Sequence, residues 1–174
     1  MPKAARTSPA KAPASPRPAR PHMPGYGLPA STKGLLPWKW AEDRLKKSHN
    51  YWLMTVRPDG APHAMPIWGV WHEGRFYFST GLTSRKARNL ARNRRCLVCN
   101  ERAHEAVILE GSARRITGIA LKKLLRRAGP DYTRKYPPWK LDPDLGGIFE
   151  FVPITGFGMW EKKFVDSATR WNFT

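Results

Sequence analysis

One stretch of the sequence decides the fold, Phe76-Tyr77-Phe78-Ser79-Thr80-Gly81-Leu82-Thr83-Ser84-Arg85-Lys86-Ala87-Arg88-Asn89-Leu90. Its aromatic residues suit a pleated strand, which ends at two hydroxyls and a glycine. Thr83 or Ser84 can then cap a helix whose apolar residues share one face. Free backbone N–H groups, the positive end of the helix dipole and the side chains of Arg85 and Lys86 would converge at this helix start. The stretch predicts a phosphate-sized anion site, although a solvated basic helix has the same pattern.

Composition sets the broad class of the protein. The chain has 174 residues, of which 41% are apolar and 11% aromatic, enough for the core of one globular domain. Its formal net charge of +18 indicates an acidic partner, but charge alone does not choose among nucleic acid, a membrane surface and a phosphorylated ligand. Two cysteines and no leading apolar run favour a cytoplasmic protein without a signal peptide or a membrane-spanning segment.

The first 37 residues differ in composition from the rest. They hold nine prolines and six Lys or Arg residues, and no acidic residue precedes Glu42. Such a segment has too little apolar surface to offset the entropy cost of ordering. We therefore expect residues 1–37 to form a disordered, basic, Pro/Ala-rich arm and residues 38–174 to form the folded domain. The arm has the charge to bind nucleic acid or anionic lipid, but a solubilising N-terminus explains the same composition.

Short strands dominate the folded part of the chain. Apolar alternation and turn signals predict strands over residues 51–57, 61–71, 76–80, 95–100, 106–116, 147–152 and 155–160. Helices are predicted over residues 38–47, after the cap at Ser84, and over residues 121–128, ended by Gly129-Pro130. Gly111 is expected at a bulge, and Pro66 at an edge or a bulge. This order predicts a mainly β (α+β) fold, namely a split antiparallel β-barrel of about six strands, of Greek-key type, with flanking helices. Strands and helices do not alternate, which excludes a doubly wound fold.

Spacing excludes several kinds of site. The sequence contains no Gly-rich dinucleotide fingerprint and no P-loop. Cys96 and Cys99 have a CxxC spacing, but in a strand their side chains point to opposite faces, and no second pair completes a zinc site. The five histidines show neither metal-ligand spacing nor a catalytic triad. We therefore expect no metal ion and no nucleophile activated by histidine.

The Ser84-Arg85-Lys86 motif after a strand, with residues 51–60 and 62–71, resembles the pyridoxamine 5'-phosphate oxidase-like family over about residues 38–174. Members of that family are split β-barrels that bind a flavin or a deazaflavin. The resemblance implies that Ser84, Arg85 and Lys86 hold the phosphate of FMN. It also implies that the hydroxyls of Ser79 and Thr80 bond the phosphate or the ribityl chain. The flat ring is then expected along the second strand, beside Met65, Pro66, Ile67 and Trp68.

The end of the chain carries a second part of the resemblance, the sequence Thr169-Arg170-Trp171-Asn172-Phe173. Split barrels of this family are usually homodimers whose cofactor lies in a groove between the subunits. The resemblance implies that Arg170 and Trp171 reach the partner's cofactor. A terminal strand anchored in the core by its aromatic residues would show the same sequence, so both interpretations stay open.

The function implied by the resemblance is that of a homodimeric oxidoreductase. It would bind FMN, or alternatively F420, at the dimer interface and transfer a hydride to or from a small organic substrate. The cofactor would supply the redox chemistry, so no catalytic side chain is assigned. The long closing signature of true pyridoxamine 5'-phosphate oxidases is missing, and the chain looks closer to a subgroup that includes F420-dependent reductases. The alternatives are a non-catalytic cofactor or haem carrier and a basic nucleic-acid-associated protein of the same fold.

Overall fold

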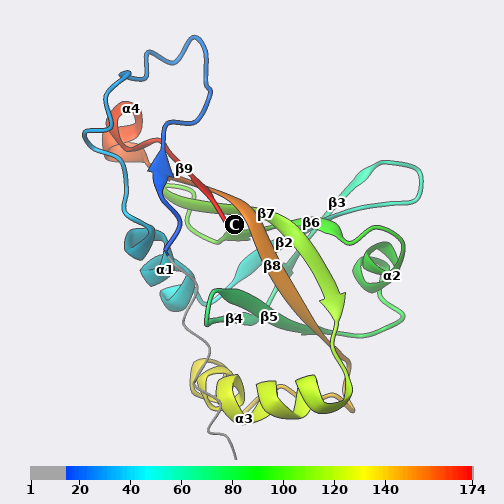
Figure 1. Cartoon of the computed structure of the whole chain (residues 1–174). Coiled ribbons are helices and arrows are strands. Elements are labelled where there is room, and N and C mark those ends of the chain that lie inside the picture. The colour runs from blue at the N-terminus through cyan, green and yellow to red at the C-terminus, as the bar shows by residue number, and fades with distance from the viewer. Residues whose placement is uncertain (1–14, 174) are drawn as a thin grey trace, which may run out of the picture.

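The computed structural model describes residues 15–173 of the chain (Figure 1). The helices are α1 (Trp38–Lys47), α2 (Arg85–Arg92), α3 (Gly118–Lys135) and α4 (Phe164–Ser167), with a 3-10 turn at Glu161–Lys163. The strands are β1 (Pro18–Ala19), β2 (Tyr51–Val56), β3 (Pro62–Ile67), β4 (Gly69–His72), β5 (Arg75–Thr80), β6 (Arg95–Asn100), β7 (Glu105–Arg115), β8 (Gly147–Trp160) and β9 (Thr169–Asn172). Helix α1 and strand β6 have the predicted bounds.

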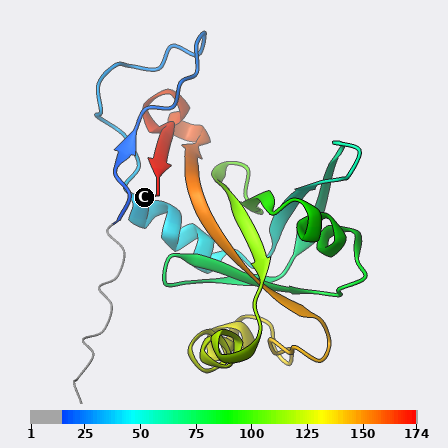
Figure 2. The same cartoon turned by 45° about the vertical axis from the view of Figure 1, so that its right-hand side comes forward.

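All of these strands belong to one antiparallel sheet. They follow the order β1-β9-β8-β7-β6-β2-β3, and β5 pairs with both β4 and β8. Strands distant in sequence are neighbours, as where β2 pairs with β6, so the sheet is not a simple meander. Figure 2 shows β8 running across the sheet from the side of α3 towards α4. The sheet does not close, because β3 pairs only with β2 and β4 only with β5 among the described strands. The mainly β expectation is confirmed, with more strands than predicted.

The core lies in two clusters on either side of the β4–β5 hairpin. The larger cluster fills the concave side of the sheet with fully buried side chains such as Leu53, Phe76 and Phe151. The smaller cluster joins α3 to the sheet through residues such as Leu124 and Ile148. Helix α3 therefore stands as a separate wall beside the hairpin (Figure 1).

Strand β8 joins two segments that the sequence predicts as separate strands, residues 147–152 and 155–160. Pro153 lies opposite Gly111, where the register of β7 shifts. A Cβ on Gly111 would lie 2.2 Å from the carbonyl oxygen of Val152, so no side chain fits there. The predicted bulge at Gly111 is confirmed. The predicted break between the two strands is wrong, because the bulge lets β8 continue past a proline that lacks an N–H donor.

Two further element boundaries differ from the prediction. The strand expected over residues 61–71 splits at Trp68 into β3 and β4, which pair with different strands. Helix α3 continues through Pro130 to Lys135. Its buried residues Ala128 and Tyr132 lie on both sides of the proline, so packing against the sheet outweighs the local helix-breaking effect.

Residues 15–37, here called the strap, have a defined path along β9 and α4 (Figure 2). Strand β1 in the strap pairs with β9. Arg20 donates four hydrogen bonds of 2.7 to 3.2 Å to the backbone carbonyls of Ser31, Lys33, Asp166 and Ala168. Leu36 is only 6% exposed and belongs to the larger core cluster. These contacts correct the expectation of disorder for residues 15–37. The first part of the predicted arm lies outside the described residues.

Candidate functional site

The start of helix α2 has the geometry that its sequence predicts. Ser84 is the cap residue, and its Oγ accepts a hydrogen bond of 3.3 Å from the N–H of Ala87. The same Oγ lies 3.2 Å from the Oγ1 of Thr80 at the end of β5. The hydroxyls of the strand and of the helix cap are therefore tied together. The N–H groups of Arg85 and Lys86 precede the first possible intrahelical bonds and point away from the helix body.

The cations at this helix start have no acidic partner. Among the described residues, no carboxylate forms an ion pair with Arg85, Lys86 or Arg88. Lys86 is partly buried, and burial lowers its pKa from the usual value because the charged form loses water. A half-buried ammonium without a counter-charge favours an anion beside it. The site is therefore electrostatically suited to a phosphate.

A cavity of about 460 Å³ opens beside Lys86. It is lined by six of the residues implied by the resemblance, Pro66, Ile67, Trp68, Ser79, Thr80 and Lys86. Strand β3 with Trp68 after it, strand β5 and helix α2 bring these side chains together from three separate parts of the sequence. The cavity is of the size that small-molecule ligands occupy. Apolar side chains, two hydroxyls and the ammonium of Lys86 therefore surround the same cavity.

An aromatic stack forms one wall of this cavity. The ring of Trp68 lies 4.9 Å from the ring of Tyr136, at an interplanar angle of 13°. The hydroxyl of Tyr136 lies 2.6 Å from the carbonyl oxygen of His49 and accepts a hydrogen bond of 3.0 Å from the N–H of Gly69. The indole N–H of Trp68 donates to Asn50. The break between β3 and β4 is thus held rigidly, with a half-exposed indole facing the cavity.

Five of the residues implied by the resemblance do not line the cavity. Ser84 and Arg85 lie next to it at the helix start. Met65 is 41% exposed on the edge strand β3, and Arg170 is exposed on β9, several strands away. Trp171 is fully buried in the larger core cluster, and its ring lies 5.4 Å from the ring of Trp38. The expectation that Trp171 reaches a cofactor is therefore corrected, because its side chain points into the core of its own chain.

The sequence reasoning missed half of the cavity lining. The additional residues are Asn50, Tyr132, Trp139, Lys140, Asp142 and Leu145. Most of them come from the end of α3 and the loop that follows it. The one available sequence signal was Trp139, an aromatic residue beside a proline pair in a segment without periodicity. In the structure this side chain is 53% exposed. Burial raises the pKa of Tyr132, so its hydroxyl stays neutral at physiological pH.

Two kinds of site are not found in the part of the chain that the structure describes. No helix there is long and apolar enough to cross a membrane. No group of three or more His, Cys, Asp or Glu side chains within residues 15–173 is placed to hold a metal ion.

Comparison with known proteins identifies the family of this chain. The family description "Pyridoxamine 5'-phosphate oxidase" matches residues 39–151, which is more than half of the chain. The chain therefore belongs to the pyridoxamine 5'-phosphate oxidase family. No curated protein is detectably similar to it in sequence.

Solved structures share the fold at low sequence identity. A conserved hypothetical protein from Mycobacterium tuberculosis is 22% identical, with a TM-score of 0.62 over 75% of this chain and 88% of that chain. An F420 reductase is also 22% identical, with a TM-score of 0.51 over 66% of this chain and 94% of that one. A haem-binding protein from Mycobacterium smegmatis is 15% identical, with a TM-score of 0.53 over 76% of this chain and 62% of that one. The chain thus shares its fold both with an F420 reductase and with a haem-binding protein.

Proposed function

We propose that this chain is an oxidoreductase that binds FMN, or alternatively F420, and transfers a hydride to or from a small organic substrate. The observation that carries the proposal is the cavity that joins the unpaired Lys86, the hydroxyls of Ser79 and Thr80, and the indole of Trp68. The family and the fold shared with an F420 reductase support it. Bound in this cavity, the flavin or deazaflavin would supply the hydride chemistry.

The residues of the cavity fit such a cofactor in three parts. Lys86, Arg85 and the free N–H groups of α2 would bind the phosphate, where helix dipole and side-chain charges add. The hydroxyls of Thr80 and Ser79 would orient the sugar-alcohol chain through hydrogen bonds. Trp68, fixed by Tyr136, would present an apolar edge to the flat ring and exclude water from it.

One face of the sheet supports a homodimer. A single register row crosses six strands and joins Pro66, Trp52, Cys99, Ile108, Phe157 and Arg170. Residues of one row lie on one face, and this row faces away from the core row that contains Leu53 and Leu109. Trp52 in the row is 44% exposed. A second copy of the chain would cover this apolar row.

Twofold symmetry gives Arg170 the role that the resemblance implies. An axis through the middle of the row, between Cys99 and Ile108, would bring the Arg170 end of one copy to the Pro66 end of the other. Pro66 lines the cavity. In the homodimer that we propose, Arg170 would therefore reach the partner's cofactor, while Trp171 anchors β9 in its own core.

A haem carrier is the first alternative, favoured by the haem-binding neighbour. The cavity lining offers no histidine, cysteine or methionine among the described residues, and these are the usual axial ligands of haem. Tyr132 could ligate iron only as a tyrosinate, which its raised pKa opposes. The donor set thus fits a flavin or deazaflavin better than haem.

A nucleic-acid-associated protein is the second alternative, favoured by the unpaired cations of α2. Backbone phosphates would meet exposed cations, and each neutralised phosphate would release counterions, so affinity would fall steeply with salt. A mononucleotide held in the cavity would lose less affinity. Titrations of FMN, F420 and an oligonucleotide at two salt concentrations therefore separate the two functions.

The proposal is tested by the visible spectrum of the purified full chain and the mass of any released chromophore. If the protein is colourless, FMN and F420 are added separately and the bound fraction is measured. We expect saturable binding of one of them, followed by hydride exchange with a substrate panel. Binding of neither cofactor, with haem or an oligonucleotide bound instead, would overturn the proposal.

The dimer is tested by Trp52→Glu. We expect this substitution to raise the dissociation constant of the dimer by about a hundredfold or more, because each of two copies would bury a carboxylate. Light scattering during size-exclusion chromatography reports the mass. Val165→Glu is the matched control, since Val165 is 42% exposed on α4, outside the row. A wild-type monomer, or an unchanged dimer for Trp52→Glu, would refute this interface.

A further inference from the structure

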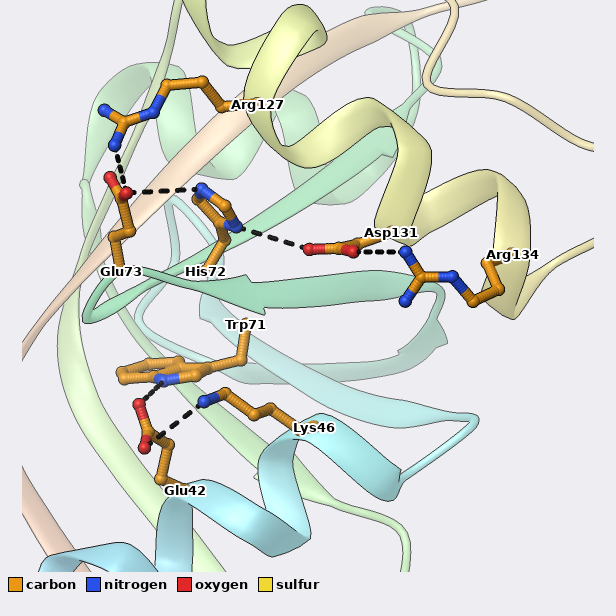
Figure 3. A network of polar contacts seen from close by, with 8 residues as sticks. All are labelled: Glu42, Lys46, Trp71, His72, Glu73, Arg127, Asp131 and Arg134. Atoms are coloured by element: carbon orange, nitrogen blue, oxygen red, sulfur yellow. Dashed lines mark hydrogen bonds and ion pairs between the residues drawn. The ribbon is translucent and has the colours of Figure 1, made fainter.

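A second cavity of about 610 Å³ lies on the other side of the β4–α3 wall. It is lined by residues of α1, of β4 and its turn, and of α3, which are Glu42, Lys46, Val70, Trp71, His72, Glu73, Asp131, Arg134 and Lys135. None of these residues lines the first cavity. Figure 3 shows the polar contacts around it, with α1 below the hairpin and α3 above it. The cavity is thus distinct from the candidate cofactor site.

Every carboxylate of this cavity already has a cationic partner. Glu42 accepts from the indole of Trp71 and lies 3.3 Å from the Nζ of Lys46. Glu73 is paired with Arg127, which lies one helical turn before Asp131 in α3. Asp131 lies 2.9 Å from Arg134 (Figure 3). The acidic side chains therefore cancel three cations and leave no free negative charge in the lining.

Lys135 is the remaining cation of the lining, and it has no acidic partner. Its ammonium donates to the hydroxyl of Tyr51 and, at 3.3 Å, to the carbonyl oxygen of Gly69. No described carboxylate forms an ion pair with it. An ammonium has three hydrogens, so one remains without an acceptor among the described groups. Burial lowers the pKa of Lys135 to about 8, and the more distant charge of Glu101 offsets only part of this effect.

His72 offers a second unused polar atom in the same cavity. Its Nδ1 faces Asp131 at 3.4 Å. Its Nε2 is buried and has no hydrogen-bond partner, since the nearest oxygen of Glu73 is 3.7 Å away. Buried polar atoms without partners are rare in native proteins and indicate an absent water, ion or ligand. The Nε2 of His72 is closed to water in the wall of the cavity, so Lys135 is the group that a polar ligand in the cavity would complete.

We propose that this cavity binds a small organic anion, a carboxylate or a phosphate ester, whose charged oxygens pair with Lys135. The anion would supply the counter-charge and the third acceptor that Lys135 lacks. The indole of Trp71, held by Glu42, and the side chain of Val70 provide the apolar part of the wall. This site does not depend on the proposed cofactor.

The test is competitive trace acetylation of the wild-type full chain, with each lysine quantified by peptide mass spectrometry. Inorganic phosphate and succinate are the probes, each compared with sodium chloride at equal ionic strength. We expect at least one of the two probes to slow the labelling of Lys135 about fivefold or more near saturation, because a paired ammonium is protonated and covered. The two probes distinguish a phosphate site from a carboxylate site. Lys39, exposed and paired with Asp43, is the control whose labelling should stay unchanged.

The outcomes for the two sites are read separately in the same sample. Protection of Lys86 by phosphate reports the proposed cofactor site, and protection of Lys135 reports the second cavity. Equal labelling of Lys135 in chloride, phosphate and succinate would overturn the inference, as would equal protection of Lys39 and Lys135. Protection of Lys135 that saturates while Lys39 is unaffected would support it, whatever happens at Lys86.

Discussion

A chain that begins at residue 38 is expected to unfold at a much lower urea concentration than the full chain. The truncation removes Leu36 from the core, together with the strand pairing between β1 and β9. It also leaves the carbonyls of Asp166 and Ala168 without Arg20. Burial of one leucine is worth about 2 kcal/mol, and the charge-assisted bonds add a similar amount. We therefore expect a loss of about 4 kcal/mol in the free energy of unfolding.

The matched comparison is a chain that begins at residue 15. It retains every one of these contacts, so it should unfold at the same urea concentration as the full chain. Tryptophan fluorescence follows both transitions, since Trp38 and Trp171 lie beside Leu36 in the core cluster. Arg20→Ala should cost about 2 kcal/mol and Arg17→Ala, at an exposed position, close to nothing. If the chain from residue 38 were as stable as the full chain, the strap would contribute nothing to the fold.

The ordered path of the strap could not be predicted from the sequence. Composition predicts whether a segment can bury enough apolar surface by itself, and residues 15–37 cannot. The segment is held instead by one arginine and one leucine that meet partners more than a hundred residues away, as Arg20 meets Asp166. Contacts of such sequence separation leave no local pattern in the chain. For the same reason, the sequence did not predict that β8 is one continuous strand, because this depends on Gly111 in the neighbouring strand β7.

Local signals, in contrast, were enough to bring together the residues that we propose to bind a phosphate. The hydroxyls, cap and cations between Ser79 and Lys86 lie within one strand-to-helix turn, so spacing alone places them together. The other wall comes from Tyr132 and the loop around Trp139, which no motif connects to that turn. The burial of Trp171 also depends on a contact with a neighbouring strand. A Cβ on Gly158 would lie 2.3 Å from its ring, so this glycine leaves the space into which the indole packs.

The double substitution Arg85→Ala with Lys86→Ala is expected to weaken cofactor binding by roughly thirtyfold, or about 2 kcal/mol. Both side chains flank the free N–H groups at the start of α2, and neither has an acidic partner among the described residues. Their removal should spare stability, because Lys86 is a half-buried charge whose burial is unfavourable. Fluorescence titration with FMN and with F420 measures the affinity, and urea unfolding measures the stability.

A second double variant, Arg92→Ala with Arg94→Ala, removes the same net charge at the other end of α2. If the site is a phosphate grip for a mononucleotide, this variant should bind the cofactor like the wild-type protein, because its cations are a helix length away from Ser84. If the cations act together as a surface for nucleic acid, both double variants should weaken oligonucleotide binding and flatten its salt dependence to a similar degree. Equal cofactor affinity in wild type and in the Arg85/Lys86 variant would mean that the phosphate does not lie at the start of α2, and the function proposed from that geometry would fall with it.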